Sequence, residues 1–257
     1  MEIQPASNRK LKEWKKLLMS KYRRKEGLFI AEGIRCVEQI LMNGSVEVKE
    51  LLIEQETRFD ERLKTAGKPI YELESDDFQS VSDTDNPQGV VAVCKTPVPA
   101  DIGELAESGG LIAATDAIQD PGNLGTIIRT ASWFGVNGLI FGTGTVDPFH
   151  PKVVRSTAGA TGALPYVAGD LDQIFSALEE KKRKIYLLAG EEGAKPLGQI
   201  KPGKKAVLVV GNEANGISRS LMTPDRELVK IEGGAAGVES LNAGVALSIG
   251  LYRFTEI

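Results

Sequence analysis

The second half of the chain alternates short, nearly continuous apolar runs with amphipathic stretches, and this pattern strongly constrains the fold. The apolar runs predict strands at Leu111–Thr115, Gly138–Phe141, Lys184–Ala189, Ala206–Gly211 and Leu228–Ile231. Helical patterns lie between and after them, at Leu124–Phe134, Leu171–Lys181 and Leu241–Phe254. Strands without polar alternation are buried on both faces, so the pattern predicts an α/β fold with a mostly parallel sheet covered by helices on both sides.

The first part of the chain predicts a smaller α/β domain. Its strand patterns lie at Leu28–Ile30, Val46–Ile53, Pro69–Leu73 and Gly89–Val93, and its helical patterns at Asn8–Tyr22, Glu32–Met42 and Glu56–Thr65. Prolines and glycines then gather between Lys95 and Gly110, as is typical of a linker. We therefore expect a domain at 1–95, a linker at 96–110 and a second domain at 111–257.

A strongly basic segment opens the chain. Residues 1–25 hold nine lysines and arginines against two glutamates, a balance of +7. Because the formal net charge of the whole chain is −4, the remaining residues carry a charge of −11. Segregated positive charge on an acidic protein favours contact with phosphate groups. The alternative is a merely solvated helix face. The residues expected to contact nucleic-acid phosphate are Arg9, Lys10, Lys12, Arg23 and Arg24.

Several classes of protein are disfavoured. The apolar runs are too short to span a bilayer and the N-terminus lacks the apolar segment of a secretory signal, so we expect a cytoplasmic protein with no membrane partner. Cys36, Cys94 and the single histidine, His150, match no metal-ligand spacing, so no metal is expected. We expect the two cysteines to be buried apolar residues and His150 to have a loop or packing role.

Two enzyme classes lack their motifs. A nucleotide-dependent oxidoreductase requires a third glycine and a following helix, which the Gly142–Thr145 turn does not provide. A hydrolase of the nucleophile-elbow type is disfavoured because that motif is missing and His150 has no evident partner.

Three loops rich in Gly, Asn and Glu follow predicted strands, where open parallel sheets bind their ligands. The first, Asp120–Ala131, enters a helix and carries Arg129 about a turn and a half beyond Asn123. Both side chains can face one site at a helix N-terminus, which favours an anion. The alternative is an N-capping asparagine with a separate surface arginine.

The second and third loops add directed polar groups. Val209–Ser218 places Glu213 beside Asn212 among glycines that allow a ligand to approach the backbone, although a plain strand-to-helix connection would use similar residues. In the third loop, Gly237–Ala246, Ser240 is expected to cap a helix. Asn242 is then expected in the first turn, where a directed hydrogen bond explains it better than helix propensity does.

Taken together and in this order, the three loops resemble the TrmH/SpoU branch of the SPOUT RNA methyltransferases, over roughly residues 110–255. The matching positions are Asn123 with Arg129, Gly211-Asn212-Glu213 with Gly216-Ile217-Ser218, and Ser240-Leu241-Asn242, supported by Arg155-Ser156, Gly159-Ala160 and Pro165. The chain departs from the family pattern at Ile231-Glu232-Gly233-Gly234 and at Ala243.

The N-terminal part is similar to the L30e-like substrate-binding domain often fused in this family. The similarity lies in Asn8, Lys12, Arg23, Phe29, Glu32, Gly33 and Asn86-Pro87-Gln88-Gly89.

The resemblance implies a SPOUT domain with a deep C-terminal trefoil knot, a homodimer formed through that domain, and S-adenosylmethionine as cofactor. By position in the motifs, the implied cofactor contacts are Leu188, Ala189, Gly190, Val210, Gly211, Ile231, Leu241 and Ala246. The implied catalytic set is Arg129, Asn123, Glu213, Ser240 and Asn242. Because arginine stays protonated, we expect Arg129 to act first as an electrostatic clamp, with a general-base role second.

The implied reaction is methyl transfer to a ribose 2′-hydroxyl of structured RNA, with 23S rRNA as the expected substrate. A tRNA 2′-O-methyltransferase is an alternative. A non-catalytic RNA-binding or ribosome-assembly factor is another, and it would show no affinity for the cofactor.

Overall fold

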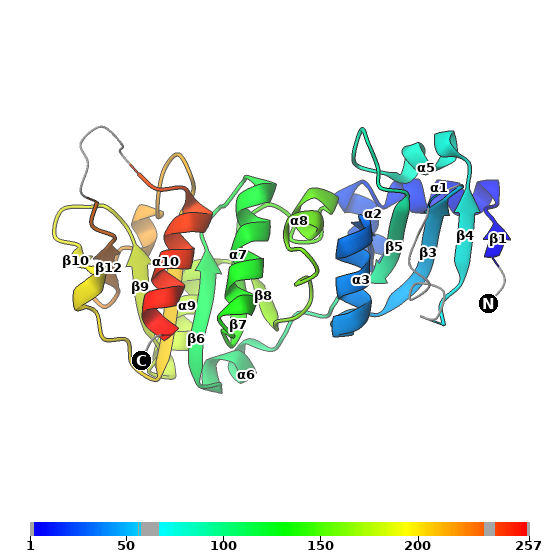
Figure 1. The fold of residues 1–257 in the computed structure, drawn as a ribbon. Helices are drawn as coiled ribbons and strands as arrows, with labels where there is room; N and C mark the ends of the chain where they lie inside the picture. Colours follow the sequence, from blue (N-terminus) through cyan, green and yellow to red (C-terminus); the bar gives the residue numbers. More distant parts are fainter. Residues whose placement is uncertain (1–2, 56, 58–66, 234–239, 256–257) are drawn as a thin grey trace. The chain divides into compact units, whose positions relative to one another are not determined.

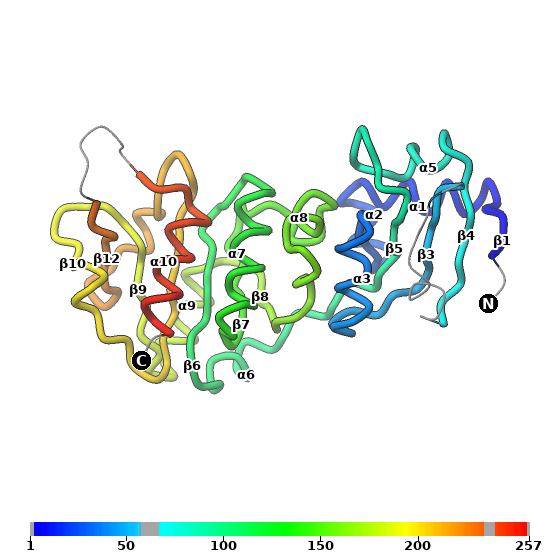
Figure 2. The backbone as a smooth tube through the Cα atoms, in the orientation of Figure 1, coloured from blue at the N-terminus to red at the C-terminus, as the bar shows by residue number. Residues whose placement is uncertain are grey.

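The computed structural model describes residues 3–55, 57, 67–233 and 240–255. Its contacts divide the chain into two compact units, which are described separately. Unit 1 comprises residues 1–98 and 147–163, and unit 2 comprises residues 99–146 and 164–257. Figure 2 follows the backbone from blue to red, and in the order of the sequence the segment 147–163 comes between two strands of unit 2. No local pattern predicted that this segment belongs to unit 1.

Unit 1 is built on a mixed sheet with the order β1-β4-β3-β5-β2. Its strands are β1 (Ile3–Pro5), β2 (Leu28–Glu32), β3 (Val48–Glu54), β4 (Ile70–Leu73) and β5 (Val90–Lys95). Its helices are α1 (Asn8–Lys16), α2 (Ser20–Glu26), α3 (Ile34–Asn43), α5 (Ser75–Val81) and α8 (Pro151–Ser156). The small α/β domain was predicted, although α5 and α8 were not. The predicted helix Glu56–Thr65 lies outside the described residues except for Thr57.

The basic N-terminal segment forms two helices, whereas one helix was predicted over Asn8–Tyr22. Helix α1 ends at Lys16 and α2 begins at Ser20. The guanidinium of Arg23 donates hydrogen bonds to the carbonyl oxygens of Leu17 and Leu18, both at 2.9 Å. In a continuous helix these two carbonyl oxygens would accept hydrogen bonds from the backbone of the next turn. The guanidinium replaces those bonds, which reduces the free-energy cost of the break.

Segment 147–163 is fastened to the rest of unit 1 by buried ion pairs. Arg23 pairs with Asp147 at 2.6 Å, and Arg155 of α8 pairs with the buried Glu32 of β2 at 3.1 Å. The single histidine, His150, caps α8 by accepting a hydrogen bond from the Lys152 backbone at 3.2 Å. Burial lowers the pKa of His150, which favours the neutral ring that this acceptor role requires.

Both cysteines are buried and free, as expected, and the thiol of Cys36 lies 3.7 Å from the Val154 carbonyl. Burial raises the pKa of Cys36 to about 11, which disfavours the thiolate, the reactive form of a cysteine. Within the described residues, no three His, Cys, Asp or Glu side chains gather as a metal site would require. No helix of the described part is long and apolar enough to cross a membrane.

Unit 2 contains the predicted sheet, in which every recorded strand pair is parallel. The order is β10-β12-β9-β11-β6-β7-β8. The strands are β6 (Gly110–Thr115), β7 (Gly138–Gly142), β8 (Tyr166–Gly169), β9 (Lys184–Leu188), β10 (Lys195–Pro196), β11 (Lys205–Val210) and β12 (Glu227–Lys230). Its helices are α6 (Ile102–Glu107), α7 (Pro121–Trp133), α9 (Leu171–Glu180) and α10 (Ala243–Thr255), with 3₁₀ turns at Leu197–Gln199 and Arg219–Leu221.

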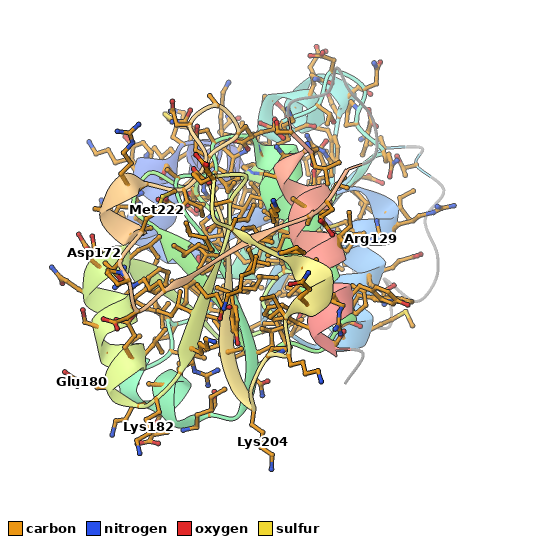
Figure 3. All side chains as sticks on the ribbon, turned by 90° about the vertical axis from the view of Figure 1, so that its left-hand side faces the viewer. Arg129, Asp172, Glu180, Lys182, Lys204 and Met222 are labelled. Carbon is orange, nitrogen blue, oxygen red and sulfur yellow. The ribbon has the colours of Figure 1, made fainter. Side chains whose placement is uncertain are left out.

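Helices cover both faces of this sheet, which confirms the predicted fold class. On one face α6 and α9 pack with alternate residues of the strands, among them Val207 and Val209 of β11. On the other, α7 and α10 lie side by side (Figure 1). There Gly250 of α10 lets the helix approach β11, because a Cβ at this position would lie 2.5 Å from Cδ2 of Leu208. Exposed charged residues such as Glu180, Lys182 and Lys204 lie at the periphery of the unit (Figure 3).

The linker and the trefoil knot predicted for this half are not established by the structure. Residues 96–110 contain helix α6, whose Leu105 and Ala106 are buried in the core of unit 2, although the stretch was predicted as a linker. The domain boundaries therefore stay a proposal. The trefoil knot also stays a prediction, because residues 234–239, which lead from β12 towards α10, lie outside the described residues.

Candidate functional site

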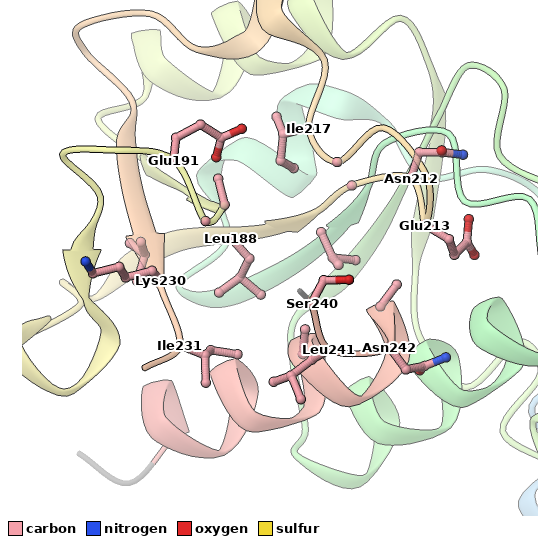
Figure 4. Close-up of a pocket in the computed structure, with 18 of the residues that line it drawn as sticks. Leu188, Glu191, Asn212, Glu213, Ile217, Lys230, Ile231, Ser240, Leu241 and Asn242 are labelled. Atoms are coloured by element: carbon pink, nitrogen blue, oxygen red, sulfur yellow. The ribbon is translucent and has the colours of Figure 1, made fainter. Parts of the chain in front are cut away.

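A cavity of about 560 Å³ opens where β9, β11 and β12 end (Figure 4). These strands are neighbours in the sheet, and the wall is completed by residues 240–242, which precede α10, and by Ala243 and Ala246 in its first turn. The position is the one expected for a ligand in an open parallel sheet, beyond the carboxyl ends of the strands. All eight residues predicted to contact the cofactor line this cavity.

The lining fits a cofactor with an apolar part and a charged part. Leu188, Ile217 and Leu241 provide apolar walls, while Glu191 and Glu213 provide carboxylates. A Cβ added at Gly190 would meet no protein atom within 4 Å, so the space beside this backbone is open. The volume is in the range of small-molecule sites, and the mixed lining suits S-adenosylmethionine.

A chain of hydrogen bonds joins three of the five predicted catalytic residues at the edge of this cavity. The Asn242 amide donates to Oδ1 of Asn123 at 2.7 Å, and the Asn123 amide donates to Oε1 of Glu213 at 2.9 Å. Asn242 directly precedes α10, Asn123 lies in α7, and Glu213 lies in the loop after β11, so the three come from segments far apart in the sequence. We call this set the Asn123–Glu213–Asn242 cluster.

Glu213 is held as a carboxylate. Burial would raise its pKa, but hydrogen bonds from the Asn123 amide and from the backbone of Gln119 and Asp120 outweigh burial and lower the pKa below its ordinary value. Because the ionised form accepts all of these bonds, the cluster keeps its arrangement at neutral pH and weakens as the pH falls through the folded-state pKa.

Ser240 lines the cavity, but it does not cap α10 as predicted. Asn242 precedes the helix, and its Oδ1 accepts a hydrogen bond from the Val245 backbone at 3.2 Å, which is the geometry of an N-cap. Asn242 therefore has two roles, because its oxygen caps the helix while its amide binds Asn123.

Arg129 lies apart from the cluster, although it was predicted to share a site with Asn123. It is exposed, and within the described residues no hydrogen bond or ion pair is recorded for its guanidinium. Arg129 is six positions after Asn123 in the helix, which places the two side chains about 120° apart around the axis and moves Arg129 about 9 Å along it. The predicted contact with Asn123 in the same chain is therefore absent from the described structure.

The residues predicted to bind RNA divide into two groups. Arg9, Lys12 and Arg24 are exposed, as an RNA contact requires. Arg23 is only 3% exposed and is engaged by Asp147 and two carbonyl groups, so its prediction as an RNA-binding residue is wrong. Lys10 is half-buried and ion-paired with Glu50, which leaves it little freedom to bind RNA.

Asp116 is a residue of this site that sequence reasoning missed. It follows β6 directly, is buried, and accepts a hydrogen bond from the Ser218 backbone at 2.6 Å. The only signal in the sequence was an acidic residue at the carboxyl end of a predicted strand.

Comparison with protein families gives two matches. Residues 110–252 match the model described as the SpoU rRNA Methylase family. Residues 8–92 match the model described as an MRM3-like substrate binding domain.

Similar individual proteins cover nearly the whole chain. The 23S rRNA (guanosine(2553)-2′-O)-methyltransferase RlmP of Bacillus subtilis is 38% identical, over 98% of each chain. The AdoMet-bound rRNA methyltransferase from Sinorhizobium meliloti superposes with a TM-score of 0.84 at 26% identity, covering 98% of this chain and 96% of that one. The SpoU methyltransferase AviRb from Streptomyces viridochromogenes, in complex with AdoMet, gives 0.84 at 25% identity, with 97% of each chain covered.

Proposed function

Because this chain belongs to the SpoU rRNA methylase family, we propose that it transfers a methyl group from S-adenosylmethionine to a ribose 2′-hydroxyl of 23S rRNA. The observation that carries the proposal is the Asn123–Glu213–Asn242 cluster at the edge of the cavity. The name of the Bacillus relative makes a guanosine of 23S rRNA the first position to map. A cytoplasmic location is part of the same proposal.

The cavity residues hold the cofactor in this proposal. When bound, S-adenosylmethionine supplies a methyl group on a sulfonium sulfur, and this sulfur leaves readily as a neutral thioether. The backbone at Gly190 and Gly211 and the side chains of Leu188, Ile231 and Leu241 surround it. The cavity contributes orientation, because a fixed donor and acceptor react far faster than free ones.

The cluster binds the ribose. Glu213 is a fixed acceptor for a ribose hydroxyl proton, and the Asn123 and Asn242 amides fix the orientation of the Glu213 carboxylate. A free 2′-hydroxyl is a poor nucleophile, so the protein must polarise it. Arg129 provides the positive charge for the developing oxyanion and a neighbouring phosphate.

The direct test is incubation of unmodified 23S rRNA and of tRNA with labelled cofactor, followed by nucleoside mass spectrometry. A 2′-O-methylated nucleoside from the rRNA supports the proposal. A base-methylated product, or methylation of tRNA alone, would contradict it. Cofactor binding without any methylated product would favour a non-catalytic role.

A homodimer through α7 and α10 belongs to this proposal. Both helices expose large apolar side chains, namely Trp133 on α7 and Val245, Ile249 and Tyr252 on α10. The α10 residues are three or four positions apart and therefore lie on one face of the helix. Arg129 is four residues before Trp133 and shares its face, so association through this surface brings Arg129 to a second copy.

We expect Trp133→Glu to dissociate the dimer. Trp133 is 85% exposed, and an aromatic anchor at the centre of an interface is typically a hot spot. The dimer dissociation constant should rise by about 100-fold, as measured by sedimentation equilibrium. Val98→Glu is the matched control, because Val98 is 82% exposed but lies outside α7 and α10. A mutant that sediments like the wild-type dimer would contradict the assignment of this surface.

Unit 1 binds the RNA in this proposal, and two neighbouring arginines separate binding from folding. Arg24→Ala should weaken RNA binding several-fold and reduce its salt dependence, with stability changed by no more than about 0.5 kcal/mol. Arg23→Ala should cost about 3 kcal/mol of unfolding free energy, because it leaves Asp147 and two carbonyls without their partner.

Urea unfolding and filter binding at two salt concentrations measure the two effects. An Arg23 variant of normal stability would show that this buried ion pair is not needed for folding. An Arg24 variant with unchanged affinity and salt dependence would remove this residue from the RNA surface.

A further inference from the structure

We propose that Asp116 is a positioning residue that connects the cofactor cavity with the Asn123–Glu213–Asn242 cluster. The inference rests on the proposed function and concerns the loop from Val210 to Ser218, which serves both sites. Val210, Gly211 and Ile217 of this loop line the cavity, and Glu213 belongs to the cluster. A residue that fixes this loop therefore controls both sites.

Asp116 holds the loop at both of its ends. Its backbone N–H donates to the Val210 carbonyl at 2.9 Å, where the loop begins. Its Oδ2 accepts from the Ser218 backbone at 2.6 Å, where the loop ends. Asp116 is 5% exposed, and among the described residues its side chain has this hydrogen bond and no ion pair. A buried carboxylate that lacks a cation depends on such hydrogen bonds.

The residue after Asp116 adds a second connection to the same loop. Ala117 has a φ of 52°, a left-handed conformation that is unfavourable for a residue with a side chain. Its carbonyl accepts a hydrogen bond from the Asn212 amide at 2.8 Å. Oδ1 of Asn212 in turn accepts from the backbone of Ala214 and Asn215, so the tip of the loop is also fixed.

Loss of the Asp116 carboxylate should release the Ser218 end of the loop. Ile217, the neighbour of Ser218, then no longer has a fixed place in the cavity wall. Glu213 lies five residues before Ser218 and depends on the same loop geometry for its contact with Asn123. Cofactor affinity and turnover should therefore fall together, whereas a contact with RNA alone would change neither cofactor affinity nor the loop.

The test compares Asp116→Ala with Asp116→Asn in the full chain. Asp116→Ala should raise the Kd for S-adenosylmethionine, measured by calorimetry, about tenfold and should lower kcat about tenfold. Asp116→Asn should stay within about threefold of the wild type in both, because the amide oxygen still accepts from Ser218. Hydrogen exchange of the Ser218 amide should accelerate at least about tenfold in the alanine variant only.

Two further variants complete the design. Asp170→Ala removes a similar bond, from the Gln173 backbone to the N-cap of α9 at 3.1 Å, and should reduce stability without changing Kd or kcat. Ser218→Pro removes the donor in place of the acceptor, at a φ of −58° that suits proline. It should reproduce the effect of Asp116→Ala, and it replaces that variant if the latter does not fold.

Wild-type Kd and kcat in a folded Asp116→Ala variant would overturn the inference, as would an Asp116→Asn variant as impaired as the alanine one. A wild-type protein that binds no cofactor would instead overturn the proposed function. The exchange rate of the Ser218 amide would still decide whether Asp116 fixes the loop.

Discussion

Arg129→Ala is expected to lower the kcat of methyl transfer about 1000-fold while the affinity for S-adenosylmethionine stays unchanged. Removal of one preorganised charge or donor at a developing oxyanion typically costs this much. The guanidinium is exposed and is absent from the cavity lining, so its loss leaves the cofactor contacts intact. Single-turnover transfer and calorimetric titration measure the two quantities separately.

The expected loss also depends on where Arg129 acts. In its own chain, Arg129 is turned away from Asn123, and within the described residues it has no recorded partner. It shares a helix face with Trp133, which is 85% exposed. We therefore expect Arg129 to complete the cluster of a second copy across the proposed interface.

A heterodimer of two inactive chains tests this arrangement. One chain carries Arg129→Ala and the other carries Asn242→Ala, which removes the contact with Asn123. If Arg129 acts across the interface, one site of the heterodimer is intact, and its turnover should be about half that of the wild type. If Arg129 acts within its own chain, both sites are defective and the heterodimer should be inactive.

Lys204→Ala is the control for the loss of a surface cation. Lys204 is exposed, and it directly precedes β11, at the end of this strand opposite the cavity. Its loss should leave kcat within about twofold of the wild type. Near-normal turnover of the Arg129 variant would remove this residue from the mechanism.

The sheet of unit 2 and the place of its site could be predicted because both depend on local patterns. Runs such as Ala206–Gly211 are apolar at every position, which is typical of a strand buried on both faces. Polar loops that follow such strands meet at one edge of a parallel sheet. The pattern placed the three loops at one edge, and the family resemblance then assigned Asn123, Glu213 and Asn242 to one site before their hydrogen bonds were known.

What could not be predicted depends on contacts between distant residues. A count of positive charge does not distinguish Arg24, which is exposed, from Arg23, whose partner Asp147 lies 124 residues away. Residues 147–163 likewise belong to unit 1 through contacts with residues far away in the sequence, among them that pair and Arg155 with Glu32. Asp116 likewise has no meaning as a single acidic residue until Ser218 is placed beside it.

Gly211→Ala is expected to weaken cofactor binding by at least about 100-fold, so that methyl transfer becomes undetectable under standard conditions. A Cβ at Gly211 would lie 2.2 Å from the carbonyl carbon of Gly216 and 2.4 Å from the backbone nitrogen of Ile217. Because both are backbone atoms, a side-chain rotation cannot relieve the clash, and the loop must open. Opening moves Ile217 out of the cavity wall and separates Glu213 from Asn123.

Two glycines of unit 2 provide controls for this substitution. A Cβ at Gly190 or at Gly198 would meet no protein atom within 4 Å. Gly190 lines the cavity, so Gly190→Ala should reduce cofactor affinity only a few-fold, whereas Gly198→Ala should leave it unchanged. Calorimetric titration gives the affinities, and urea unfolding shows whether the Gly211 variant is folded at the titration temperature. A folded Gly211→Ala protein that binds the cofactor like the Gly198 variant would show that the close approach of Gly211 to Gly216 is not what shapes the cavity.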